Sequence, residues 1–511
     1  MPSTTVSAGP SRRFYLTFVS LLLVWVALLM VVATTVIPDG YWWTYYSVDY
    51  SRGFIRRGLA GEILHLFDDG DYFAALRAVR WIPTVFFTVG LALVTWAVAL
   101  RGGSTQRKFL LALLIPVLPF GFAFGVFSAR TDLLGATALI AFAVSLTLAT
   151  TRRTTYIVSA VYGVALAVLT LIHEATPFLF GLGTIAALTV LARGLSTGSF
   201  RISTALAMGP GIGTALAVVV FGKRGISGEL CQLVPHGPVD HPMAAKPTPE
   251  QLLNGFHNYI DYHDWVCRAI LPLFDQSFGD ALSFVTGIGV LALAASTLYG
   301  IGVFAVSMYV IAQVSGVPVQ RFRDALLTQR LAVLAGLVLI LPIFLTGVDW
   351  IRWWVIIAFD LGIVYLLYAT RQSEIEEPPT ARSVKVLVVA AALLALIPIG
   401  IIPVFAALTS EMDDATRLAV VSGSVETATP AQVKAAFVVN FVRYTSWPAS
   451  SRKRGGASST SCSCATTTRS SSCATRWPRR RPAPRRPRTR RRARGQPGRS
   501  RRSPARRRTS R

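Results

Sequence analysis

Apolar runs long enough to cross a lipid bilayer as helices recur along most of this chain. They lie at about residues 14–37, 81–100, 109–127, 132–150, 155–172, 177–192, 203–221, 284–314, 329–347, 351–370 and 384–408. Only 15% of the residues are charged, whereas a soluble domain carries about 25%. We therefore expect an all-α integral membrane protein with about eleven transmembrane helices.

The short loops give the expected orientation, because basic residues favour the cytoplasmic side. With residues 1–13 inside, the predicted inner loops are 101–108, 151–155, 193–201, 315–330 and 371–382. The first four are clearly basic, and the last is mixed. The outer loop 222–280 holds four basic and seven acidic residues. The membrane domain, residues 14–408, is therefore expected to have its N-terminus inside and a large loop outside.

The outer loop 38–80 departs from this charge rule, since it carries five arginines beside six acidic residues. Within it, "SVDYSRGFIRRGLAGEIL" spans residues 47–64. Its apolar positions recur about every fourth residue, at Ile55, Leu59, Ile63 and Leu66 or Phe67. This spacing predicts a short amphipathic helix over 53–67, at the membrane surface or between spans. Its glycines favour a close approach by another backbone or a ligand.

The unusual polar residues gather on the same predicted outer side. They are Asp49, Arg52, Arg56, Arg57, Glu62, Arg130, Asp132, His173, Glu174, Asp349 and Arg352. Each has a simpler interpretation: lipid contact for Arg56 and Arg57, a helix end at His173, or a local ion pair between Asp349 and Arg352. Asp360 lies inside a span and needs a partner. The convergence of these residues on one side is what indicates a site.

This set of residues suits a phosphate-bearing lipid, because arginine binds phosphate oxygens in a fixed fork and stays charged. The predicted phosphate ligands are Arg52, Arg56, Arg57, Arg130 and Arg352. The predicted catalytic carboxylates are Asp49 and Glu174, one of which would act as general base on an acceptor hydroxyl. The predicted supporting residues are Asp132, His173 and Asp349. No cofactor is expected, and no nucleotide-binding signature occurs.

Two resemblances bear on this set. Acidic residues in the first outer loop and about eleven spans look like the GT-C-fold glycosyltransferases, which use polyprenyl-phosphate sugars; the matching residue here is Asp49 and, less well, Asp39. "DYSRGFIRRGL", "HEATP" and "DWIRWW" together resemble motifs of an uncharacterised family of bacterial polytopic membrane proteins. The first resemblance implies a glycan-assembly enzyme of the bacterial cytoplasmic membrane that uses polyprenyl-phosphate-linked sugars, and the second implies no activity. The alternatives are a transporter or flippase, and a non-catalytic scaffold.

The loop 222–280 offers two further kinds of site. Cys231 and Cys267 would form a disulfide if the loop faces an oxidising compartment, and are otherwise free thiols. Four residues with metal-ligand chemistry also lie here: His257, Asp261, His263 and Asp264. Their spacing matches no tight metal motif, so no metal ligand is assigned. The loop is similar to the large outer loop of O-antigen polymerases and ligases; the plainer alternative is a solvated cap.

The amino-acid composition changes after residue 408. Within 409–448, "QVKAAFVVNFVRYTSWP" resembles the opening helix of YfiR-like periplasmic domains. Residues 449–511 then hold 21 arginines, one lysine and no acidic residue, and lack the aliphatic side chains for a core. Two interpretations of this tail stay open: a disordered basic arm, and a YfiR-like domain read out of frame. Since the rest of the chain is nearly neutral, the net charge of +26 does not indicate nucleic-acid binding.

Overall fold

The structure is a computed structural model that describes residues 10–35, 40–68, 70–240, 259–347 and 349–396. The described chain is almost entirely helical, and its one sheet is a two-stranded antiparallel pair. The all-α prediction is therefore confirmed. The end of the eleventh predicted span, the YfiR-like stretch and the arginine-rich tail lie outside the described residues.

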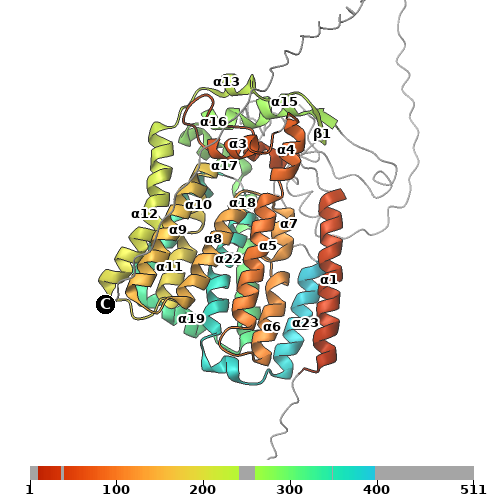
Figure 1. The fold of residues 1–511 in the computed structure, drawn as a ribbon, viewed down its shortest axis with the longest axis vertical. Helices are drawn as coiled ribbons and strands as arrows, with labels where there is room; N and C mark the ends of the chain where they lie inside the picture. Colours follow the sequence, from red (N-terminus) through yellow and green to blue (C-terminus); the bar gives the residue numbers. More distant parts are fainter. Residues whose placement is uncertain (1–9, 36–39, 69, 241–258, 348, 397–511) are drawn as a thin grey trace, which may run out of the picture. The chain divides into compact units, whose positions relative to one another are not determined.

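Most of the described helices run side by side as a bundle (Figure 1). The helices of the bundle are α1 (Arg12–Thr35), α5 (Ile82–Ala99), α6 (Gln106–Leu114), α7 (Phe122–Phe127), α8 (Asp132–Leu148), α9 (Arg152–Ile172), α10 (Thr176–Leu179), α11 (Gly181–Val190), α12 (Thr197–Phe221), α17 (Phe278–Ile288), α18 (Val290–Ser315), α19 (Val319–Leu326), α20 (Arg330–Leu339), α21 (Leu341–Thr346), α22 (Trp350–Ala369) and α23 (Ala381–Leu396). Three short 3-10 turns lie between them: η2 (Ile115–Val117), η4 (Leu327–Gln329) and η5 (Ser373–Glu376). The described part of each of the eleven predicted runs falls mainly on these helices.

By length and composition, eight helical segments of the described chain can cross a membrane. Three apolar helices are shorter: Asp132–Leu148, Gly181–Val190 and Phe278–Ile288. Two of these shorter helices are runs that the sequence predicted as spans, at 132–150 and 177–192. The run at 384–408 is described only as far as Leu396, so it is not among the eight.

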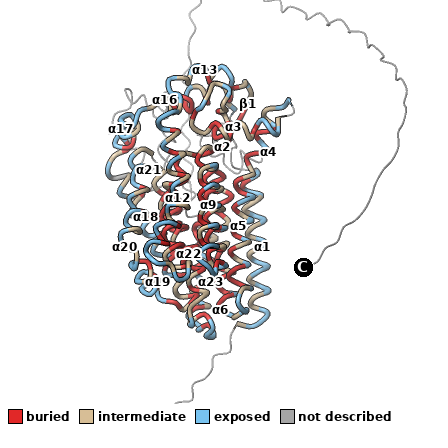
Figure 2. Tube along the Cα trace, turned by 60° about the vertical axis from the view of Figure 1, so that its left-hand side comes forward, coloured by how far each residue is buried: buried red, intermediate tan, exposed pale blue. Residues whose placement is uncertain are grey.

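The bundle exposes apolar side chains on its outside, as a protein in lipid does. Leu21 on α1 is 64% exposed, Val220 on α12 is 69% exposed, and Leu331 on α20 is 78% exposed. The central helix α22 is buried instead, and it packs against α5, α8, α11 and α18. Figure 2 shows this arrangement as a buried centre with exposed outer helices.

The two predicted outer loops meet at one end of the bundle, where they form a structure that we call the cap (Figure 1). It comprises α2 (Gly40–Trp43), η1 (Thr44–Tyr46), α3 (Gly58–His65), α4 (Tyr72–Val79), α13 (Ser227–Cys231), β1 (Pro238–Asp240), β2 (Tyr259–Asp261), α15 (Tyr262–Trp265), the π-helical turn η3 (Val266–Ile270) and α16 (Pro272–Asp275). The cap has its own buried cluster, which includes Ile55, Leu64, Tyr262 and Trp265.

The cap and the bundle join at the end of α9. This helix begins with a capping box, in which Thr151 and Thr154 satisfy each other's backbone N–H groups. It ends at Ile172, and the next residues turn before α10 begins at Thr176, with Pro177 in its first turn. That short turn carries His173 and Glu174 into contact with the cap.

Candidate functional site

Arg57 occupies a strained position at the start of α3. Its φ of 65° is left-handed, and among the described residues it is the one non-glycine with a positive φ. Such a conformation costs on the order of 1–3 kcal/mol and tends to persist at functional positions. From there the Arg57 guanidinium donates two hydrogen bonds to Glu174, at 2.9 Å from Nε and 3.0 Å from Nη2. This bidentate pair links the first cap loop to the turn after α9.

Arg56 shares the same carboxylate. Its Nη1 lies 3.7 Å from Glu174 Oε1, its Nη2 donates to the backbone carbonyl of Leu273, and its guanidinium stacks 4.6 Å above the ring of Phe274. We call Arg56, Arg57 and Glu174 the arginine pair site. Its side chains are 25–32% exposed. Two arginines therefore share one carboxylate at a partly exposed position.

The environment of Glu174 fixes its protonation state. Burial alone would raise the pKa of the Glu174 carboxyl, but Arg57 and Arg56 outweigh it and hold that pKa well below its usual range. Glu174 is therefore a carboxylate at any physiological pH. As a general base it would first have to release at least one of its two arginines.

His173 connects this site to the interior. Its side chain is buried, its ring stacks on Tyr45, and its Nδ1 accepts a hydrogen bond from the backbone N–H of Ala175 at 3.2 Å. Burial, and then the positive charge of Arg57, lower the pKa of His173 to about 4. His173 is therefore a neutral imidazole at neutral pH, and it adds no charge to the site.

A second group of charged residues lies deeper. Arg130 forms an ion pair with Asp349, and Arg352 forms one with Asp132. Arg352 also contacts Asp349, with 3.3 Å between Nη2 and Oδ2. We call these four residues the buried quartet, since all of their side chains are less than 20% exposed. Two arginines and two carboxylates balance, so the quartet has no excess charge. It ties the turn before α8 and the start of α8 to the start of α22.

The buried quartet refines two predictions. The local ion pair between Asp349 and Arg352 is present, as the simpler interpretation held. The long-range pairs of the quartet, however, join residues 219 and 220 positions apart in the sequence. No local pattern could have indicated those pairings.

Asp49 and Arg52 make other contacts. The Asp49 carboxylate accepts hydrogen bonds from Ser51 N at 2.8 Å and pairs with His65 Nε2 at 2.8 Å. Burial would raise the pKa of Asp49, but the hydrogen bonds from Ser51 and His65 lower it overall. Arg52 meets loop 222–280 through its backbone carbonyl, which accepts from Lys223 Nζ. The structure thus brings Arg56, Arg57 and Glu174 together and pairs Asp49 with His65 instead.

The predicted helix over 53–67 is shorter than expected, because Arg57 ends the preceding turn in a left-handed conformation and α3 begins only at Gly58. Leu66, near the end of the predicted apolar face, directly follows α3 and is 80% exposed. The expected close approach is present. A Cβ on Gly61 would lie 2.3 Å from the carbonyl oxygen of Val48, and one on Gly58 would lie 2.3 Å from the Tyr50 ring.

Asp360 has the partner that its buried position requires. Its Oδ2 accepts a hydrogen bond from the backbone N–H of Gly183 at 2.9 Å, in the first turn of α11. Helix N-termini favour acidic groups there. The contact joins α22 to α11 and assigns Asp360 a structural role.

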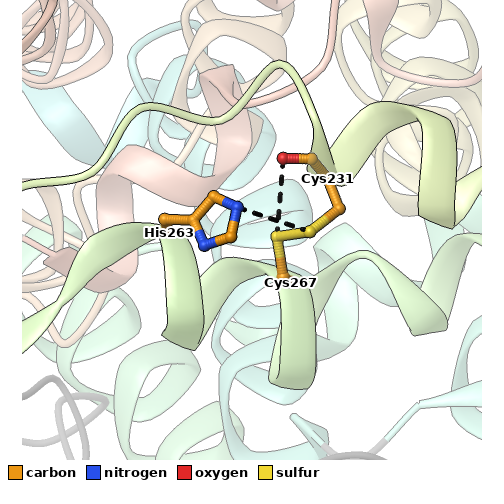
Figure 3. A group of neighbouring side chains, drawn as sticks. All are labelled: Cys231, His263 and Cys267. Atoms are coloured by element: carbon orange, nitrogen blue, oxygen red, sulfur yellow. Dashed lines mark hydrogen bonds between the residues drawn. A yellow bond between two sulfur atoms is a disulfide. The ribbon is translucent and has the colours of Figure 1, made fainter.

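In loop 222–280, the disulfide alternative is the one present, because Cys231 and Cys267 are bonded (Figure 3). Four of the six histidines, His65, His173, His236 and His263, are described, and all lie in the cap or where it meets the bundle. His241 and His257 lie outside the described residues.

Sequence comparison assigns the membrane domain to a family. Residues 15–395 match the family described as "Uncharacterised membrane protein Rv1490". The chain belongs to this family. It is 39% identical over 398 residues to "Uncharacterized protein Rv1490" of Mycobacterium tuberculosis, which covers 77% of this chain and 92% of that relative. The same values hold for "Uncharacterized protein Mb1527" of Mycobacterium bovis.

The family match confirms the predicted kinship with a bacterial family of multi-pass membrane proteins, and with it a membrane location. The matched region stops at residue 395, so the YfiR-like stretch 432–448 lies beyond it. No solved structure matches this chain.

Proposed function

We propose that this protein binds a polyprenyl-phosphate-linked substrate at its cap and acts there as a glycan-assembly enzyme of the glycosyltransferase type. The observation that carries the proposal is the arginine pair site, where two arginines share one carboxylate and remain partly exposed. A phosphate would accept charge-assisted hydrogen bonds from both guanidinium groups.

The surroundings of the arginines support a lipid-linked ligand. Phe274 lies beneath both guanidinium groups, and Tyr45 faces Arg57. Aromatic faces hold the two cations in place by contacting the guanidinium planes rather than their N–H groups. The bundle beside the cap is apolar on its outside, so an isoprenoid chain has a lipid-facing surface along which to lie.

The proposal narrows the predicted ligand set. Arg56 and Arg57 are retained as phosphate ligands, whereas Arg130 and Arg352 are neutralised by Asp349 and Asp132. For catalysis, Asp49 is the better base, because its carboxylate carries a histidine partner and is not held by an arginine. Under this proposal, Glu174 holds the two arginines while the site is empty, and the phosphate competes with its carboxylate for their N–H groups.

Binding by purified protein in nanodiscs tests the proposal. We expect a short-chain polyprenyl phosphate to bind and the corresponding polyprenol, which lacks the phosphate, to bind at least tenfold more weakly. Arg56→Ala/Arg57→Ala should weaken phosphate binding at least about 100-fold, since each of the two lost hydrogen bonds to a charged group contributes about 1.5–3 kcal/mol. Arg77→Ala is the matched control, because Arg77 is an exposed arginine of the same cap.

An assay of cell-envelope glycans tests the enzymatic part. Cells that carry Arg56→Ala/Arg57→Ala at normal membrane level should lose a glycan species that Arg77→Ala cells retain. Equal binding of the phosphate and the polyprenol would reject the ligand class. Normal binding with unchanged glycans in every variant would instead favour a transporter or a scaffold.

A further inference from the structure

We infer that His236, Asp261 and His263 in the cap form a binding site for a divalent transition metal of the zinc class. One potential ligand atom from each of the three residues lies within 4.8 Å of the other two. Imidazole nitrogen and carboxylate oxygen are common ligands of zinc in proteins, whereas calcium and magnesium prefer sites made only of oxygen. This site is separate from the arginine pair site.

The individual contacts bring the three side chains together. His236 Nδ1 lies 3.1 Å from Asp261 Oδ2, and the rings of His236 and His263 stack with their centroids 4.0 Å apart. The other oxygen of Asp261 accepts a hydrogen bond from the backbone N–H of His263 at 2.9 Å. Tetrahedral zinc with bonds of about 2.1 Å places its ligand atoms roughly 3.4 Å apart, so side-chain rotations suffice.

Backbone hydrogen bonds and a disulfide hold the three residues in place. The antiparallel pairing of β1 with β2 sets Pro238 opposite Asp261, and Tyr262 N–H donates to the Gly237 carbonyl at 2.8 Å. The disulfide between Cys231 and Cys267 closes the other side (Figure 3). His236 follows the first cysteine by five residues, and His263 precedes the second by four. The site is therefore held by covalent and backbone bonds before any metal binds.

The neighbours of His263 favour a bound cation. Asp264 Oδ1 lies 3.3 Å from His263 Nδ1, which places a second carboxylate beside this imidazole. On the other side, His263 Nε2 lies 3.6 Å from Cys231 Sγ. A metal ligand is usually oriented by a contact of the ring nitrogen that does not bind the metal, so one of these two contacts can orient His263 while the other gives way to the metal. The exposed side chain of His236 leaves the site open to ions from solvent.

Metal analysis of the full-length protein tests the site. The protein is purified with a tag that lacks histidine, stripped with a chelator and dialysed against zinc in the presence of a chromophoric competitor. We expect one zinc ion per chain in the wild type, and at least tenfold weaker binding in His236→Ala and in His263→Gln. His65→Ala is the matched control, since His65 is also a cap histidine paired with an aspartate.

The disulfide reports whether each variant keeps its fold, through thiol labelling of the denatured protein. If His263→Gln misfolds, the zinc affinity of His236→Ala alone tests the site. The His236 side chain is 68% exposed, so its removal should not disturb packing. A wild-type protein that binds no zinc would overturn the inference. So would equal zinc binding by the wild type and by His236→Ala, or an equal loss in His65→Ala.

Discussion

The arginine pair site and the buried quartet use the same two kinds of side chain at neighbouring places, but they differ in charge balance and exposure. In the quartet, two arginines meet two carboxylates and all four are shielded from solvent. In the arginine pair site, two arginines meet one carboxylate and all three remain partly exposed. From the sequence alone the two groups cannot be told apart, because both consist of arginines and acidic residues. The difference suggests that the quartet stabilises the bundle and that the pair site binds a ligand.

The largest effect should come from breaking the quartet. Asp132→Ala should destabilise the protein by about 3–5 kcal/mol, because it leaves Arg352 buried beside a single remaining carboxylate, Asp349. The thermal unfolding midpoint in detergent, together with the yield of monodisperse protein, measures this. Asp324→Ala is the control, since Asp324 pairs with Arg323 at an exposed position, and such pairs contribute little.

An apolar replacement sharpens the same test. Within the described chain, Arg352 Nε and Asp132 Oδ1 have no hydrogen-bond partner, so the quartet is incompletely satisfied. Asp132→Leu/Arg352→Met should therefore recover much of the stability that Asp132→Ala loses. If the double variant is as unstable as Asp132→Ala, the quartet has a role other than mutual neutralisation.

The next effect concerns His173, which lies between the two groups. Its pKa is lowered to about 4 in the folded protein, against an ordinary value of 6.5. As the pH falls below 6.5, the unfolded chain binds a proton that the folded chain does not, so stability is lost between pH 6.5 and pH 4. The loss amounts to about 3 kcal/mol.

Thermal unfolding from pH 7.5 to pH 4.5 measures this loss. His173→Gln should flatten the dependence of the unfolding midpoint on pH. The charges near His173 are those of Arg57, Glu174, Asp132 and Arg352. Glu174 stays ionised across this range, because Arg57 and Arg56 hold the pKa of its carboxyl well below the usual value. An identical slope in His173→Gln would contradict the assignment.

A smaller effect on stability is expected at Asp49. Asp49→Asn should cost about 1 kcal/mol, because it weakens the hydrogen bonds with Ser51 and His65. Phosphate binding at the arginine pair site should stay within twofold of the wild type, while the envelope glycan product is lost. The nanodisc titration and the glycan profile together measure this. A normal glycan profile in Asp49→Asn would remove Asp49 from the catalytic residues.

Much of the fold could be predicted from the sequence, because each apolar run and each basic loop is a local signal. The same is true of the turn after α9, where a helix end and Pro177 follow each other. The partners of the arginines could not be predicted in this way. Glu174 lies 117 residues from Arg57, and only the packing of the cap on the bundle makes them neighbours.

The helix over 53–67 shows a second limit. Its apolar spacing correctly indicates a helix, but the left-handed backbone of Arg57 interrupts that helix. An arginine side chain gives no sequence signal for a left-handed conformation. The interruption turns Arg56 and Arg57 toward Glu174. The residue that shortens the predicted helix is thus the residue that builds the site.

The central claim is that the arginine pair site binds a phosphate in competition with its own carboxylate. Its most direct test is the affinity for a short-chain polyprenyl phosphate in nanodiscs, measured for the wild type, Arg57→Ala and Glu174→Gln. Removal of a cation should weaken binding about tenfold, and removal of the competing carboxylate should tighten it several-fold, as expected for a change of one charge near a phosphate. Weaker binding in both variants, or no change in either, would contradict the claim.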